Sequence, residues 1–394
     1  MRLKQNILMI LLLSLMLGLI TTASIAKKNS KPEESEVVPE IIEEVIPETF
    51  CKAINNADNV PSEVLDTIKN YMDDYFLSLY TLELQDTTKY FSNVIDGKVS
   101  DAAIKLTVES RKLYDFDFTM SDAYYVLNIT QCVKSDGKYV VDFLEDDSFC
   151  FKFLSGITSE TYDVENTMTL EKVNDEYKIC GYEKTQGYYM MFNDSKNDDS
   201  IENIYDFFYK RLVNTIENEN YQKSKAEATA YVPSKSAKVK YDRNAASEYA
   251  SKYYHIRNED YYDFDDEGGN CQNFASQCLV KGGMVMDESG DCQWYYNNHL
   301  DYVAPWVHVT SFRDYCNENE GKGLVCEVGE NMYYAEPGDI VQVGISSISH
   351  TCIVSKIVDG HILLNSNSID MKDFPLESYT YPTRKLIKIL GSNS

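Results

Sequence analysis

The residues best suited to chemistry are a cysteine at the predicted start of a helix and a histidine further along the chain. Cys271 comes just after Gly268 and Gly269 and opens residues 271–281, where apolar residues recur at helical spacing. The start of a helix carries unpaired N–H groups and the positive end of the helix dipole, so it favours a thiolate. We therefore expect Cys271 to have a lowered pKa and to act as a nucleophile. The alternative is that it only begins a buried apolar stripe.

A cysteine nucleophile needs a base, and His350 is the candidate among the five histidines of the chain. Residues 349–370 predict a β-hairpin, because residues alternate along the first half and Asp359-Gly360 is typical of a type I′ turn. His350 then lies on the first strand. A helix-start cysteine followed by a strand histidine is the order that a papain-like cysteine hydrolase requires.

The predicted hairpin register also selects a third residue. A two-residue turn pairs Val354 with Asn365 and Cys352 with Asn367. Asn367 is then a diagonal neighbour of His350 on the same face, where its amide can hold the imidazole in one tautomer. With the nucleophile these two residues form the predicted catalytic triad. Each of the three alone has a structural explanation, and their order along the chain favours catalysis.

Four further residues are candidates to line a substrate groove beside the nucleophile. They are Gly269, Asn273, Trp294 and Trp306. A glycine lets a substrate backbone approach closely, and aromatic side chains pack against substrates, although tight turns and cores use the same residues. His299 and His308 lie in a polar stretch and are an alternative, disfavoured metal site. We expect no metal and no organic cofactor.

Several separated segments around these residues resemble one family. They are YDRNAASEYASKYY, YYDFDDEGGNCQNFASQCLVKGG, PWVHVTSFRDY, EPGDIVQV, HTCIVS and NSNSIDMKDFPL. In this order they resemble the family named "putative amidase domain" of secreted Gram-positive bacterial proteins, which is similar to the NlpC-type branch of papain-like cysteine peptidases. The resemblance covers about residues 239–390. It implies a papain-like α+β domain that hydrolyses amides without a cofactor.

The resemblance assigns roles residue by residue and departs from the family in two places. The family's histidine matches His350, and its cysteine motif matches Cys271, Asn273, Phe274, Ser276 and Gln277. Gln272 stands where the family commonly has Thr. The third position, often His-Thr in the family, is Asn367-Ser368 here, so the identity of the third residue stays open.

The remaining chain is long enough for a second domain, because 394 residues exceed one average core. Residues 51–195 predict helices at 61–79 and about 86–108 and then an antiparallel sheet with a turn at Asn174-Asp175. This order, an α+β domain of helices and a curled antiparallel sheet, resembles NTF2-like domains. It has no histidine, so a binding or spacer role is favoured there. Residues 196–238 predict a charged helical connector, which leaves 239–394 as the amidase domain.

The N-terminus predicts export. Residues 1–26 combine a basic start, an apolar run and small residues at a cleavage site, typical of a signal peptide, with an uncleaved anchor as the alternative. Residues 27–50 are rich in Pro and Glu and predict an extended spacer. Export permits disulfides among the ten cysteines, whose pairing the sequence does not specify.

These observations predict an exported α+β protein that acts as a cysteine amidohydrolase on a cell-wall peptide or another amide. A net charge of −26 excludes nucleic acid as a partner, because phosphates would be repelled. Apart from the signal segment we expect no membrane association. The sequence leaves the oligomeric state open. Two alternatives remain: a non-catalytic cell-surface binding protein, and an acyltransferase that uses the same Cys-His pair.

Overall fold

The computed structural model describes residues 46–289 and 292–394. The predicted signal peptide, residues 1–26, and most of the predicted spacer lie outside this part of the chain. Within the described residues, no helix is both long and apolar enough to cross a membrane.

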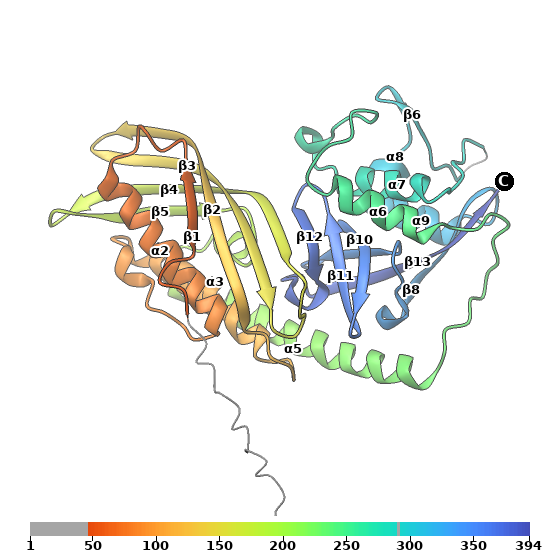
Figure 1. The fold of residues 1–394 in the computed structure, drawn as a ribbon, viewed down its shortest axis with the longest axis horizontal. Coiled ribbons are helices and arrows are strands. Elements are labelled where there is room, and N and C mark those ends of the chain that lie inside the picture. The colour runs from red at the N-terminus through yellow and green to blue at the C-terminus, as the bar shows by residue number, and fades with distance from the viewer. Residues whose placement is uncertain (1–45, 290–291) are drawn as a thin grey trace, which may run out of the picture. The chain divides into compact units, whose positions relative to one another are not determined.

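The first part of the described chain has helices packed on a curved, mostly antiparallel sheet (Figure 1). Its elements are β1 (Cys51–Asn55), α2 (Ser62–Thr81), η1 (Thr88–Tyr90), α3 (Val94–Arg111), β2 (Met120–Ser135), β3 (Lys138–Phe151), β4 (Ser159–Val173), β5 (Glu176–Lys184) and α4 (Tyr189–Phe192). The helix predicted at 61–79 and the order of helices before the main strands are confirmed. Asn174 and Asp175 both have positive φ and form the predicted two-residue turn.

Two features of this part differ from the prediction. The apolar run 149–154 has the composition of a separate strand, but its first residues complete β3, whose pairing with β2 continues to Phe151. The short strand β1 was not predicted, and it pairs in parallel with β2. Its residues lack a distinct alternating pattern, so only tertiary packing identifies the strand.

A long helix and a second α+β part follow. The elements are α5 (Asp198–Ala228), α6 (Arg243–Tyr253), η2 (Asp265–Glu267), α7 (Cys271–Lys281), β6 (Tyr296–Asn298), β7 (Asp301–Tyr302), α8 (Ala304–Val307), α9 (Val309–Glu318), β8 (Gly323–Glu330), η3 (Met332–Tyr334), β9 (Ile340–Gly344), β10 (Ile348–Val358), β11 (His361–Ser366), β12 (Asp370–Pro375), η4 (Leu376–Ser378) and β13 (Thr383–Asn393). The helix predicted at Cys271 and the hairpin around Asp359-Gly360 are confirmed.

One sheet runs through both parts. Its strand order is β1-β2-β3-β4-β12-β11-β10-β9-β13-β8, with β5 beside β4. The start of β4 pairs with β12 over residues 160–162, and the rest of β4 pairs with β5 over residues 166–173. Asp163, which has a φ of 54°, lies where β4 changes partner. The predicted division at residues 196–238 therefore does not coincide with a break in the sheet.

Two hydrophobic cores lie on either side of the β9–β13 region. Helices α6, α7 and α9 cover one core together with the buried indoles of Trp294 and Trp306. The other core continues from α2 and α3 of the first part to buried side chains of β9 and β10, among them Val341 and Val354. Since apolar burial is the main stabilising term, the two parts share part of their folding free energy.

A buried carboxylate ties α6 to the sheet. Asp339, at the entry to β9, is completely buried and pairs with Arg243 of α6 at 2.8 Å and with Lys388 of β13 at 3.2 Å. Its position just before β9 gives this residue an anchoring role. Two cationic partners offset the cost of burying its charge, as such an anchoring role requires.

Candidate functional site

A hydrogen bond between neighbouring side chains brings the predicted nucleophile and base together. Thr351 of β10 donates its hydroxyl to the side-chain carbonyl of Gln272 in α7 at 3.0 Å. Cys271 precedes Gln272 and His350 precedes Thr351, so this bond holds the two candidate residues on adjoining stretches of helix and strand. Both side chains line the same pocket, which has a volume of about 540 Å³.

The two parts of the fold both contribute walls to this pocket. Besides Cys271 and His350, its lining includes Arg257, Asp265, Asp266, Gly268, Gly269, Ser349 and Ser368–Asp370 from the second part, and Tyr381 before β13. Residues 162–165 of β4, Thr185, Gln186 and Met190 line it from the first part. Arg257 is the one arginine or lysine among the described residues that line the pocket. Five carboxylates also line the pocket, so their charge exceeds that of this one guanidinium and the pocket favours cationic groups.

Burial sets the protonation state of the nucleophile. Cys271 is 7% exposed, and desolvation raises the pKa of its thiol to about 11. Backbone hydrogen bonds at Thr351, Gln272 and Cys271 itself act in the opposite direction without outweighing burial. The expectation of a lowered pKa is therefore wrong for this state of the site. The start of the helix does favour the thiolate, but a buried sulfur loses more hydration than these donors replace.

His350 is equally enclosed and is kept neutral. Its side chain is 6% exposed, and burial lowers the pKa of the imidazole to about 4. Its Nε2 atom is buried without a hydrogen-bond partner among the described residues. Buried ring nitrogens normally have partners, so an unpaired one in the lining of a pocket that also contains a thiol is a functional candidate. At neutral pH the pair is a neutral thiol with a neutral base.

A bulge in the hairpin moves the predicted third residue. The predicted register holds near the turn, but it shifts at Ser355, and Asn365 pairs with Ile353 instead of Val354. The predicted diagonal contact between Asn367 and His350 depended on an unbroken register. Among the described residues, no hydrogen bond joins Asn367 to His350. Extra residues in one strand of a hairpin leave no clear sequence signal, so the pattern alone could not show the shift.

Asn367 instead holds the start of α7. Its Oδ1 accepts a hydrogen bond from Asn270, the residue before Cys271, at 2.7 Å. Its amide nitrogen donates to the backbone carbonyls of Tyr253 and Tyr254 at the end of α6. The next residue, Ser368, accepts from the backbone N–H of Asn270. The segment after β11 therefore fixes the loop that delivers the nucleophile.

Three of the predicted groove residues are buried beneath the site. Asn273, Trp294 and Trp306 have no exposed surface, and none of them lines the pocket. The Trp306 indole N–H donates to Asn273 at 2.7 Å, and the two indoles stack with centroids 5.2 Å apart. The groove prediction is wrong for these three, because their polar atoms are satisfied inside the core. Gly269 does line the pocket, with a φ of 114° that disfavours other residues.

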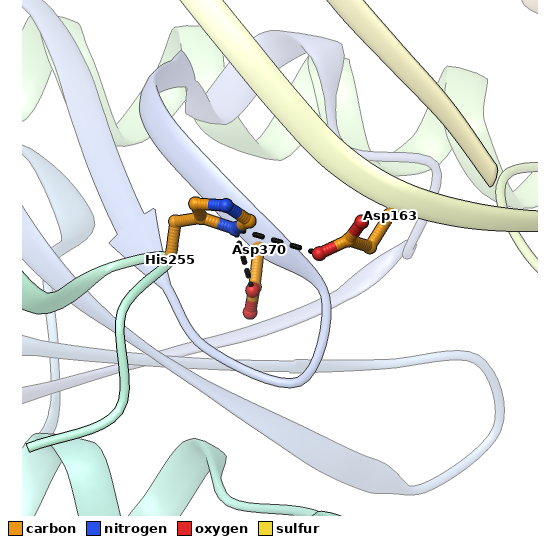
Figure 2. Close-up of side chains that lie close together, drawn as sticks. All are labelled: Asp163, His255 and Asp370. Atoms are coloured by element: carbon orange, nitrogen blue, oxygen red, sulfur yellow. Dashed lines mark hydrogen bonds and ion pairs between the residues drawn. The ribbon is translucent and has the colours of Figure 1, made fainter. Parts of the chain in front are cut away.

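An ion-pair cluster joins the two parts of the fold at the rim of this pocket (Figure 2). His255 Nδ1 lies 3.2 Å from an oxygen of Asp370 and 3.6 Å from an oxygen of Asp163, on β4. These three side chains offer atoms that could hold a divalent cation. Arg257, however, already donates to Asp370 at 3.0 Å. The guanidinium places a positive charge where a metal would bind, so the arrangement favours an ion-pair network.

Sequence patterns did not identify the contribution of β4 and its neighbours. Asp163 and Glu165 belong to a strand whose alternation indicates only burial on one side. The sequence gave a signal only for the segment after β11, because the family resemblance placed Asn367-Ser368 near the third catalytic position. The pairing of β4 with β12 follows from the order of strands in the sheet, whereas the sequence predicts two separate domains.

Comparisons with known proteins support the assignment of the second part. Residues 240–390 match the family described as "Putative amidase domain". A 139-residue stretch, 34% of this chain, is 32% identical to the uncharacterized protein YhbB of Bacillus subtilis (strain 168). The matched stretch spans 43% of that relative's length. No solved structure matches the chain. The family description indicates amide hydrolysis in general.

Proposed function

We propose that the protein is an exported cysteine amidohydrolase that cleaves an amide or peptide bond of the cell wall. The observation that carries the proposal is that Cys271, at the start of α7, and His350, on β10, line one pocket. The amidase-domain match over residues 240–390 supports the reaction class. A papain-like, NlpC-type fold for this region, and an NTF2-like fold for residues 51–195, belong to the same proposal.

The proposed reaction starts from a neutral pair. His350 accepts the thiol proton while the Cys271 sulfur attacks the carbonyl carbon of the amide. The backbone N–H of Cys271 donates to the oxyanion, an effect worth about 3 kcal/mol per donor in enzymes of this kind. Protonated His350 then gives its proton to the leaving amine as the C–N bond breaks. Water attacks the resulting thioester, loses a proton to His350 and releases the acid and the thiol.

Asn367 has a positioning role in this proposal. Its hydrogen bonds to Asn270 and to the end of α6 support the idea that it holds Cys271 in line with His350. This role replaces direct orientation of the imidazole, which the sequence predicted. The residue acts through the loop that precedes the helix and does not touch the reacting atoms.

The charge of the pocket narrows the substrate class. Asp163, Glu165 and Asp266 line it, and among the described residues no basic side chain pairs with any of them apart from His255 beside Asp163. A substrate with an ammonium group near the scissile amide would be attracted, and one with a nearby phosphate would be repelled. Peptides of the wall with a free amine have this chemistry.

A release assay on purified wall fragments tests the proposal. The parent should liberate new amino and carboxyl groups, Cys271→Ala and His350→Ala should not, and Cys292→Ala, whose sulfur does not line the pocket, should behave like the parent. Transfer to an added amine in place of water would indicate the acyltransferase alternative. Tight binding of wall fragments without turnover by the parent would support the surface-binding alternative and refute the hydrolase.

A further inference from the structure

A second pocket lies between the two parts of the fold, because elements of both contribute to its lining. Its volume is about 80 Å³. The end of α3, the strands β3 to β5 and the segment Ser378–Tyr381 all contribute to its lining. No role in the proposed hydrolysis requires this pocket.

An uncompensated guanidinium faces this pocket. Arg111, the last residue of α3, is 6% exposed, and its Nη1 has no hydrogen-bond partner among the described residues. No carboxylate forms an ion pair with it within that part of the chain. Its contacts are with the faces of Phe118 and Phe151, whose ring centres lie 5.5 and 5.4 Å from its central carbon. Buried guanidinium groups normally pair with an anion, because aromatic faces compensate only part of the lost hydration.

Two further buried polar atoms in the same lining also lack partners. They are the Oδ1 atom of Asp147 and the hydroxyl of Ser378. The other oxygen of Asp147 accepts a hydrogen bond from Thr161 at 3.0 Å. Burial, together with the neighbouring Glu145, raises the pKa of the Asp147 carboxyl, so this group is a candidate O–H donor. A guanidinium, a carboxylic acid and a hydroxyl thus all offer hydrogen bonds to one small space.

The neighbouring charged pair is already satisfied. Lys184 also lines the pocket, and its ammonium group bonds both carboxylate oxygens of Glu145 at 2.7 and 2.8 Å. This pair adds no net charge. Most of the remaining wall is apolar or aromatic, with contributions from Leu79, Phe149 and Phe374. The unpaired hydrogen-bonding groups and the apolar wall of the pocket therefore suit an anion that carries an apolar group.

We propose that this pocket binds a carboxylate that carries a short apolar group, with Arg111 as its principal partner. Guanidinium groups pair with carboxylates through two parallel hydrogen bonds, and the unpaired acid and hydroxyl can supply more. The site is independent of the thiol chemistry, because neither Cys271 nor His350 lines it.

The bound carboxylate has two possible sources, because this pocket adjoins the catalytic pocket. An experiment can distinguish them. Gln186, Ile369 and Tyr381 line both this pocket and the catalytic pocket. The group could therefore be the free carboxyl end of the amide substrate, or a separate small carboxylate that occupies the site beside it. Both sources share the same chemistry of recognition.

The test uses the full chain carrying Cys271→Ala, so that turnover plays no part. Butyrate and its neutral analogue butyramide are titrated by calorimetry at matched ionic strength against this protein. The same is done for versions with Arg111→Met or Leu79→Phe, the latter adding ring volume with all charges kept. We expect butyrate to bind at least about tenfold more tightly than butyramide, and both added changes to remove this preference. Circular dichroism checks that each variant is folded.

The second arm compares a wall peptide with a free C-terminal carboxylate and the same peptide with a C-terminal amide. A preference for the free acid that Arg111→Met removes identifies the substrate's own carboxyl end as the ligand. Butyrate binding without such a preference identifies a separate small carboxylate. Equal and weak binding of butyrate and butyramide, with no difference between the peptides, would overturn the site even if the protein proves to be an amidase.

Discussion

Cys271 illustrates how a residue's sequence position and its burial can act in opposite directions on its chemistry. The start of a helix stabilises a thiolate, and the sequence predicted a reactive one. The folded chain encloses the sulfur and raises the pKa of the thiol to about 11, with His350 held neutral beside the same pocket. The nucleophile must then be formed by proton transfer during attack, instead of resting as an ion pair.

Because His350 is buried and neutral, we expect kcat/KM to be nearly constant over an unusually broad pH range. His350 can act as a base only when neutral, which its pKa of about 4 allows over the whole range above pH 5. We expect kcat/KM to fall on the acid side near pH 4 and to stay nearly constant between about pH 5 and pH 9. The profile is measured on wall peptides or a peptide amide. An acid limb near pH 6.5 would contradict a buried neutral base.

The lowered pKa of His350 also predicts that the stability of the fold depends on pH. The pKa of His350 is about 4 in the folded state and about 6.5 in an unfolded chain, so between these values the unfolded chain binds more protons. The contribution of this group to stability is complete above pH 6.5 and is lost as the pH falls toward 4, by roughly 3 kcal/mol at most.

His350→Gln should remove this part of the pH dependence. The midpoint of urea unfolding is measured for the parent and the variant at pH 7.5 and at pH 5. We expect the parent to lose more stability than the variant on acidification. An equal loss in both proteins would show that the imidazole is not enclosed as described.

At the scale of elements, the sequence identified the parts that carry the site but not how they meet. The helix at Cys271, the strand at His350 and the turn at Asp359-Gly360 follow from local patterns, and the structure contains all three. The bulge at Ser355 depends on packing of β10 against both neighbours, which no local pattern encodes. Consequently the partner of Asn367 was predicted incorrectly, although the residue lies beside the site.

Asn367→Ala should therefore reduce activity through the loop before α7. The change removes the acceptor of the Asn270 side-chain amide and the donor to two backbone carbonyls at the end of α6, at a cost of about 1–3 kcal/mol in stability. We expect kcat to fall by about tenfold or more, with the acid limb of the pH profile unchanged, because the imidazole keeps its surroundings.

Asn365→Ala is the matched control for this prediction. Asn365 accepts a hydrogen bond from the backbone N–H of Asp373 at 2.7 Å, within the sheet, and among the described residues it forms no hydrogen bond with Asn270. It should lose stability with a much smaller loss of kcat. A shift of the acid limb in Asn367→Ala alone would instead indicate that this amide does act on the histidine.

At the scale of the whole molecule, the sheet order makes the first part of the fold a component of the site. The first part supplies the acidic residues 163 and 165 and the Arg111 wall of the proposed carboxylate pocket, and the second part supplies the nucleophile. Together they provide attraction for an amine and for a carboxylate within adjoining spaces, which matches the charge pattern of a short peptide. Sequence composition gave only a net negative charge, because charge placement depends on the fold.

The shared core predicts how the predicted domains behave when they are separated. Val341, Val343 and Val354 of the second part belong to the core that continues into the first, and the start of β4 completes the edge of β12. A fragment of residues 239–394 would expose this apolar face and an unpaired strand edge.

We expect this fragment to be poorly soluble or to unfold at a clearly lower urea concentration than residues 47–394, which should unfold in a single transition. Far-UV circular dichroism and tryptophan fluorescence report the two transitions, since both tryptophans lie in the fragment. A fragment with the same midpoint as the longer chain would instead establish residues 239–394 as an independent domain, as the sequence first predicted.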